Sequence, residues 1–110
     1  MEDIELPFKI GEQYEKWEFN LEPKDEDLNS EKYLYLGEIS FLGIVPISIE
    51  LQFDLDVLIG VKLYFKKYNL LEIEKLKVAM QDSHLSSSEW CILECNELIV
   101  LKYGASKFIN

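Results

Sequence analysis

Arginine is absent from this sequence and histidine occurs once, so 11 lysines stand against 21 acidic residues and the net charge is −10. Binding to DNA or RNA requires clustered cations that neutralise phosphates, and direct nucleic-acid binding is therefore not expected. The histidine, His84, follows Ser83, but a neighbouring pair is no catalytic triad, because nucleophile, base and orienting acid must meet in space. One histidine and two cysteines also fall short of a usual structural zinc set.

Glycine-rich motifs are missing too. The five glycines are scattered, and neither G-x-G-x-x-G nor G-x-x-x-x-G-K-S/T occurs, so no dinucleotide or phosphate cradle is indicated. The acidic run 25–27 lacks the alternating ligands and the glycine of a calcium loop. Carboxylate pairs for glycoside chemistry arise by chance among so many acids and indicate nothing without a pocket. We expect a protein with no enzymatic activity, no cofactor and no metal.

Long hydrophobic runs are also lacking. No stretch approaches the roughly 18 apolar residues of a membrane-spanning helix, and residues 1–5 carry acids in place of the apolar part of a secretory signal. We expect a cytoplasmic protein that does not bind membranes. Cys91 and Cys95 lie four apart in a predicted strand, which separates their Cα atoms by about 13 Å. That distance exceeds the disulfide limit, so we expect free, buried thiols.

The composition itself is that of a globular domain, with 48% hydrophobic and 13% aromatic residues in a chain of 110. Such a length allows a core without metal or disulfide support. Alternation of apolar and polar residues predicts strands at 14–21, 33–38, 47–54, 57–65, 90–94 and 98–103. Residues 1–10 are expected to be an extended lead-in that could pair at a sheet edge. Glycines 37 and 43 are expected to bracket a bend.

Two of these strands carry explicit expectations about their faces. In 14–21, Trp17, Phe19 and Leu21 should point to one side. In 57–65, the inward face should contain Val57, Ile59, Val61, Leu63 and Phe65. Tight turns are expected at residues 54–56 and 96–97.

One helix is predicted. Asn69 fits an N-cap, and Glu72 three residues later completes a capping box. From there to about Asp82, apolar residues recur at spacings of three and four and form one stripe: Leu70, Ile73, Leu76, Ala79 and Met80. We therefore expect a single α+β domain over residues 1–110, with a mainly antiparallel sheet of about five to six strands and one helix on one face. Short connections favour a meander.

The negative charge is distributed unevenly. Residues 1–56 hold 15 acids and four lysines, net −11, whereas residues 57–110 hold six acids and seven lysines, net +1. Acids and aromatic rings are interleaved in the first half, and acids steer a cationic partner while aromatic rings anchor it. The predicted partner-binding residues are Glu12, Tyr14, Glu15, Glu18, Glu22, Asp25, Glu26, Asp27, Glu31, Asp54 and Asp56.

A plainer interpretation is that Trp17 and Phe19 belong to the core and that the acids only keep the surface solvated. Acids added for solubility alone have no reason to concentrate in one half of the chain. The asymmetry therefore favours binding.

The small size, α+β pattern, strong acidity, lysine-only cations and lack of catalytic residues resemble the immunity proteins of bacterial polymorphic toxin and contact-dependent growth inhibition systems. Residues 14–22 (YEKWEFNLE) are similar to segments of small bacterial proteins of this kind. The resemblance is one of profile over the whole chain and transfers no functional residue. It implies a monomer or weak homodimer that binds and neutralises a cognate toxin domain, typically a basic nuclease, through an acidic surface.

Two other functions remain open from the sequence. One is a non-enzymatic scaffold or ligand-binding module that acts as a homodimer through an edge strand such as residues 98–103. The other is an enzyme with a carboxylate site, which would need a deep acidic pocket with convergent polar groups.

Overall fold

The computed structural model describes residues 6–23, 31–66, 70–82 and 89–105, with the backbone alone for residues 31 and 70–73. It contains a six-stranded antiparallel sheet and one α-helix, which confirms the predicted α+β class. The elements, in chain order, are two short 3-10 turns, η1 (Tyr14–Lys16) and η2 (Glu18–Asn20), then β1 (Leu21–Pro23), β2 (Glu31–Tyr35), β3 (Ser48–Asp54), β4 (Val57–Lys66), α1 (Leu70–Gln81), β5 (Trp90–Cys95) and β6 (Leu98–Gly104).

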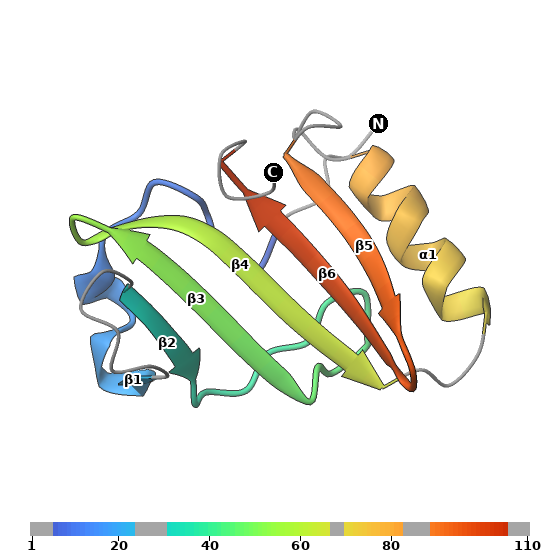
Figure 1. Cartoon of the computed structure of the whole chain (residues 1–110), viewed down its shortest axis with the longest axis horizontal. Coiled ribbons are helices and arrows are strands. Elements are labelled where there is room, and N and C mark those ends of the chain that lie inside the picture. The colour runs from blue at the N-terminus through green and yellow to red at the C-terminus, as the bar shows by residue number, and fades with distance from the viewer. Residues whose placement is uncertain (1–5, 24–30, 67–69, 83–88, 106–110) are drawn as a thin grey trace.

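The strand order is β1-β2-β3-β4-β6-β5 (Figure 1). Its first four strands form the expected meander, but the last hairpin departs from it. The chain leaves β4 through α1, reaches the outer edge as β5, and returns as β6 between β5 and β4. The helix must lie over the sheet to bury its apolar stripe. Because α1 crosses the sheet, the chain skips the position next to β4, which β6 later fills. Residues 98–103 are therefore interior, and the expectation that they form an edge strand is wrong.

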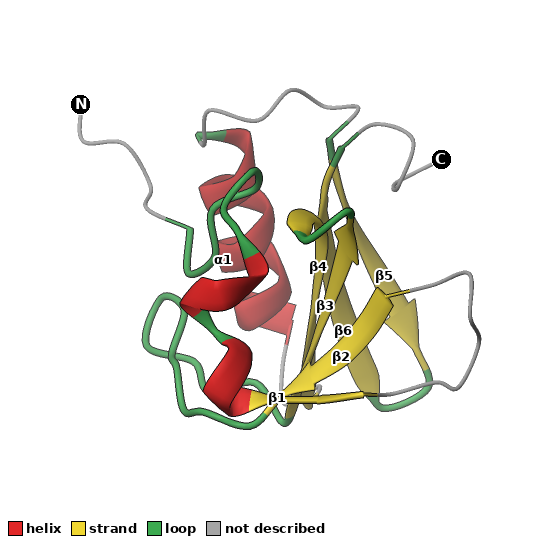
Figure 2. Ribbon diagram, turned by 90° about the vertical axis from the view of Figure 1, so that its left-hand side faces the viewer, coloured by secondary structure: helices red, strands yellow, loops and turns green. Residues whose placement is uncertain are grey.

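The described elements outside the sheet cover one of its two faces. Helix α1, the 3-10 turns and the described N-terminal segment all lie on the same side of it (Figure 2). We call this side the inner face and the opposite side the outer face. Three predicted stripe residues of α1 are buried against the inner face, namely Leu76, Ala79 and Met80. The strands supply alternate residues to the same core: Ile49, Leu51 and Phe53 from β3, Val61, Leu63 and Phe65 from β4, and Ile99, Leu101 and Tyr103 from β6.

A β-bulge in β4 changes which of its residues face inward. Phe53 pairs with Leu58 and Gln52 pairs with Gly60, which leaves Ile59 without a partner in β3. An unpaired residue shifts the alternation by one position. Leu58 is accordingly fully buried, while Val57 and Ile59 are half-buried. The predicted inward face is right for its last three residues and wrong for Val57 and Ile59.

The predicted strand at 14–21 is wrong. Trp17 N donates to Tyr14 O (3.0 Å) and Asn20 N donates to Trp17 O (2.8 Å), which closes two successive 3-10 turns. Residues three apart eclipse each other in such turns, so Tyr14 and Trp17 share a side. Trp17 is buried, whereas Phe19 is 93% exposed.

Aromatic packing explains why the chain takes this path. The ring of Phe8 meets those of Trp17 and Tyr35 at centroid distances of 5.7 and 5.0 Å. The ring of Tyr14 lies 5.4 Å from that of Phe53. These edge-to-face contacts hold the N-terminal segment against the inner face as an irregular layer. Residues 6–10 are accordingly not a strand.

Other predictions have mixed outcomes. The turns at 54–56 and 96–97 and the bend at 39–42 are confirmed in outline, with a tight turn at Leu42 and Gly43. The cysteines are free, but the predicted burial is wrong: Cys91 is half-buried and Cys95 is exposed, because β5 directs both side chains to the outer face, away from the core. Residues 1–5, Asn69 and His84 lie outside the described residues. In the described part of the chain, no helix is long and apolar enough to cross a membrane.

Candidate partner-binding surface

The acid-rich segment before β1 is fastened to the β3–β4 turn by backbone hydrogen bonds. Leu58 N donates to Glu12 O (2.9 Å), and Tyr14 N donates to Asp56 O (2.7 Å). Gly11 N donates to Leu58 O (2.9 Å), and residues 13 and 57 form an isolated bridge. Two acidic regions about 40 residues apart in the sequence therefore lie side by side.

These contacts gather six of the predicted partner-binding residues at one end of the long axis, beside β1 and the β3–β4 turn (Figure 1). Five have exposed side chains and Glu12 is half-buried. We call this region the acidic end and define it as Glu12, Glu15, Glu18, Glu22, Asp54 and Asp56.

The remaining predicted residues have different outcomes. Tyr14 is half-buried, with its ring against Tyr33 (5.3 Å) and Phe53, so it anchors the segment to the core. The backbone of Glu31 begins β2 opposite Phe53, near the acidic end. Asp25, Glu26 and Asp27 lie outside the described residues.

Lys16 lies within the acidic end. Lys16 forms an ion pair with Glu12, and its Nζ atom is 5.7 Å from the ring centroid of Trp17. Exposed pairs of this kind contribute about 0 to 1 kcal/mol. Lys16 therefore offsets only one of the six acids that define the acidic end.

Two large apolar side chains project from the same end. Phe19 in η2 is 93% exposed, and Leu55 at the tip of the β3–β4 turn is 86% exposed. Sequence reasoning missed both, because it assigned Phe19 to the interior and considered only the acids around Leu55. The signal for Leu55 was present, since its two aspartate neighbours lie on a predicted turn.

Leu55 also has an unfavourable backbone conformation. Its φ is 52° and that of Asp56 is 65°, as in the hairpin turns that favour asparagine and glycine. Leucine in this region costs about 1 to 2 kcal/mol. Leu42 has a similar φ of 57°, but its side chain packs against the core. No such packing accounts for Leu55.

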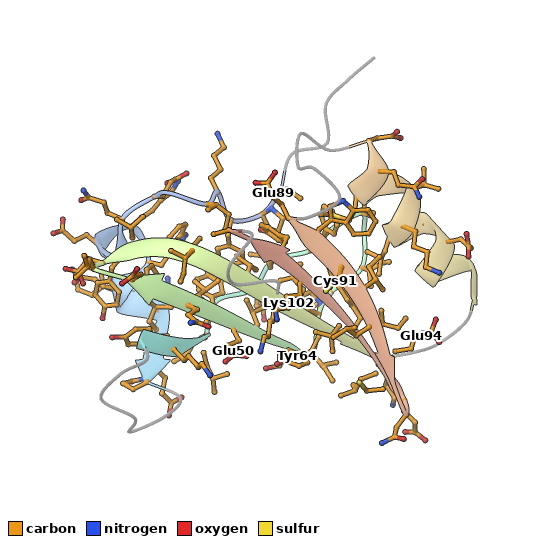
Figure 3. All side chains as sticks on the ribbon, turned by 45° about the horizontal axis from the view of Figure 1, so that its top comes forward. Glu50, Tyr64, Glu89, Cys91, Glu94 and Lys102 are labelled. Atoms are coloured by element: carbon orange, nitrogen blue, oxygen red, sulfur yellow. The ribbon has the colours of Figure 1, made fainter. Side chains whose placement is uncertain are left out.

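A second polar group lies on the outer face (Figure 3). Glu50 is only 4% exposed, and its Oε2 accepts a hydrogen bond from Tyr64 Oη (3.0 Å) and lies 3.7 Å from Lys62 Nζ. Burial, together with the charge of Glu50, raises the pKa of Tyr64 to about 12. The hydroxyl therefore stays protonated, and able to donate to Glu50, to a higher pH than an ordinary tyrosine hydroxyl.

The described residues contain no metal-binding cluster, but some of them line a hollow. No three His, Cys, Asp or Glu side chains among them come close enough to hold a metal ion. A hollow of about 690 Å³ lies at the end opposite the acidic end, and its lining is Ile47, Lys66, Cys95, Asn96, Glu97 and Leu98.

Comparisons with protein-family models, curated proteins and solved structures found no significant match to this chain.

Proposed function

We propose that this chain is a non-enzymatic, cytoplasmic immunity protein that binds and neutralises a basic bacterial toxin domain through its acidic end. The observation that carries the proposal is the exposure of Phe19 and Leu55 among the carboxylates. The two kinds of side chain have complementary roles in binding.

The apolar pair would supply affinity. Moving a leucine or phenylalanine side chain out of water stabilises a complex by about 1.5 to 3 kcal/mol. Interface energy concentrates in a few such anchors, surrounded by residues that exclude water. The strained backbone at Leu55 supports this role, because positions that break a local rule without a packing gain are often functional.

The carboxylates would supply speed and selectivity. A surface of one charge sign attracts a partner of the opposite sign and raises the association rate at low salt. A nuclease-type toxin carries cations where it holds nucleic-acid phosphates. The acidic end would occupy that groove in place of the nucleic acid.

The proposal is tested by the gene that precedes this one. We expect it to encode a large secreted protein with a basic C-terminal domain. That domain should co-purify with the present chain and lose its toxicity when the two are co-expressed. If no such domain is encoded there, or if it neither binds the chain nor is neutralised by it, the proposal is wrong.

A charge-reversed variant then tests the surface. Glu18→Lys should slow association with the toxin domain and reduce its dependence on salt. The matched control is Glu97→Lys, an exposed carboxylate on the β5–β6 turn at the far end of the sheet (Figure 1). Equal association rates for the two variants would move the binding site away from the acidic end.

A further inference from the structure

The two edges of the sheet differ in how well they are protected against pairing. At one edge, β1 has three residues, carries exposed Glu22 and ends at Pro23. Short strands, charges and proline are the usual means of blocking an edge. At the other edge, β5 has six residues, no proline and one charged residue, Glu94. Among the described strands, β5 pairs only with β6, so no described strand occupies its second side.

The hydrogen-bond pattern shows which backbone groups of β5 point outward. Gly104 N donates to Glu89 O (2.9 Å), and the register places these two residues directly opposite each other, next to the pair Trp90 and Tyr103. In an antiparallel pair, hydrogen-bonded and non-bonded positions alternate. Residues 89, 91, 93 and 95 therefore direct their N–H and C=O groups toward β6. Residues 90, 92 and 94 direct theirs outward.

The side chains of the inward-bonding residues share the outer face. Cys91, Leu93 and Cys95 are paired with Lys102, Val100 and Leu98, whereas Trp90 and Ile92 pack against the core. Cys91 is half-buried, Leu93 is 49% exposed and Cys95 is exposed. The thiols thus lie two residues on either side of Leu93, and this sequence of side chains is symmetric about it.

We propose that β5 pairs antiparallel with β5 of a second copy of this chain. The twofold axis would be perpendicular to the sheet and would pass midway between the two Leu93 residues. In this register the outward groups of Ile92 and Glu94 bond to each other across the axis. Leu93 faces Leu93 of the second copy, and each Cys91 faces a Cys95. These facing positions are non-hydrogen-bonded pairs, whose Cα atoms lie about 4.5 Å apart. That distance falls within the disulfide range of about 4.4 to 6.8 Å.

The pairing is independent of the proposed toxin binding. The acidic end lies beside β1, across the sheet from β5, and remains open in each copy (Figure 1). The twofold operation places both α1 helices on the inner face of the joined sheet and all four thiols on its outer face. The register also sets the two Glu94 residues opposite Ile92 rather than opposite each other, so like charges do not face directly.

Cross-linking with oxidised glutathione tests the register. Each Cys91–Cys95 bond forms by two thiol–disulfide exchanges: one thiol attacks glutathione disulfide and releases one glutathione, and the second thiol then displaces the other. The oxidised wild-type chain should run as a covalent dimer on a denaturing gel without reductant. Cys91→Ser alone and Cys95→Ser alone should not cross-link and should run as monomers on the same denaturing gel, because like cysteines lie about 13 Å apart along the strands. An equal mixture of the two variants should cross-link through one bond.

Two outcomes would overturn the proposal. One is cross-linking of Cys91→Ser alone to the wild-type extent, which would indicate random contact through exposed Cys95. The other is a mixture of folded variants that does not cross-link.

Sedimentation under reducing conditions tests the pairing without the disulfide. Leu93→Lys places like charges at the axis and should weaken the dimer, since Leu93 is half exposed and its replacement leaves the core intact. Val45→Lys is the control, because Val45 is 65% exposed and lies outside the strands. A wild-type chain that stays monomeric at millimolar concentration, or equal dimer stability in the two variants, would contradict the proposal.

Discussion

The side chain of Tyr103 forms two hydrogen bonds with the backbone of Phe8. Its hydroxyl donates to Phe8 O (2.8 Å) and accepts from Phe8 N (3.1 Å). The two residues are 95 positions apart, and both are buried. Burial also raises the pKa of the Tyr103 hydroxyl. This pair joins the last strand to the irregular N-terminal layer that supports the acidic end.

Tyr103→Phe should lower the free energy of unfolding by about 1 to 3 kcal/mol, because the amide and carbonyl of Phe8 lose their partner in a buried site. Urea denaturation measures the change. Tyr14→Phe is the matched control, since the contacts of Tyr14 are made by its ring and its backbone. Equal stability of the two variants would contradict the assigned role.

Gly104→Ala should destabilise the protein strongly, by about 3 kcal/mol. A Cβ atom at Gly104 would lie 2.2 Å from Ile59 O, in the bulge whose carbonyl also accepts from Ala105 N. Gly11→Ala is the control, because Gly11 also has a positive φ of 97° but nothing lies within 4 Å of the added carbon. Thermal unfolding should show a much larger loss for Gly104→Ala, and a similar loss in both would exclude the close approach as its cause.

The outer-face pair of Glu50 and Tyr64 should make stability depend on alkaline pH. The pKa of Tyr64 is about 12 in the folded state, whereas its ordinary value, which applies to the unfolded chain, is 10.0. The unfolded chain therefore loses the proton first, so this contribution to stability is full below pH 10 and disappears as the pH rises toward 12. Tyr64→Phe should reduce the fall in unfolding free energy over this range. Identical pH dependence in both proteins would contradict the pairing.

Leu55→Asn should separate stability from binding. Asparagine tolerates a positive φ, so the free energy of unfolding should rise by up to about 1 kcal/mol, while the affinity for the toxin domain should fall. Leu42→Asn is the control, because Leu42 has the same backbone region but a packed side chain, and its replacement should destabilise the protein. Urea denaturation and calorimetric titration measure the two effects. A Leu55→Asn variant that is less stable would show that Leu55 serves the fold.

Long periodic segments made much of this fold predictable. Alternation identified β3, β4 and the β5–β6 hairpin, and a spacing of three to four identified α1. Residues 14–21 were misread because eight residues fit a period of two and a period of three about equally well. Tertiary contact decides between them, through the ring of Trp17 against those of Phe8 and Phe53.

The candidate site was predicted less completely. The acids at residues 12–22 and 54–56 could be read from charge alone, but their proximity depends on the hydrogen bond from Tyr14 N to Asp56 O. The exposure of Phe19 follows from the 3-10 turn and could not be known while the segment was taken for a strand. The crossover from β4 to β5 through α1 likewise depends on which strands the apolar stripe of the helix packs against.

Calorimetric titration of the toxin domain against a variant with Phe19→Ser and Leu55→Asn tests the central claim most directly, because every carboxylate of the acidic end is retained. Two lost anchors should weaken binding by about 100-fold or more, mainly through faster dissociation. The control, Val45→Ser, removes an exposed apolar side chain elsewhere and should bind as the wild-type chain does. Wild-type affinity in the double variant would contradict the assignment of the acidic end as the toxin-binding surface.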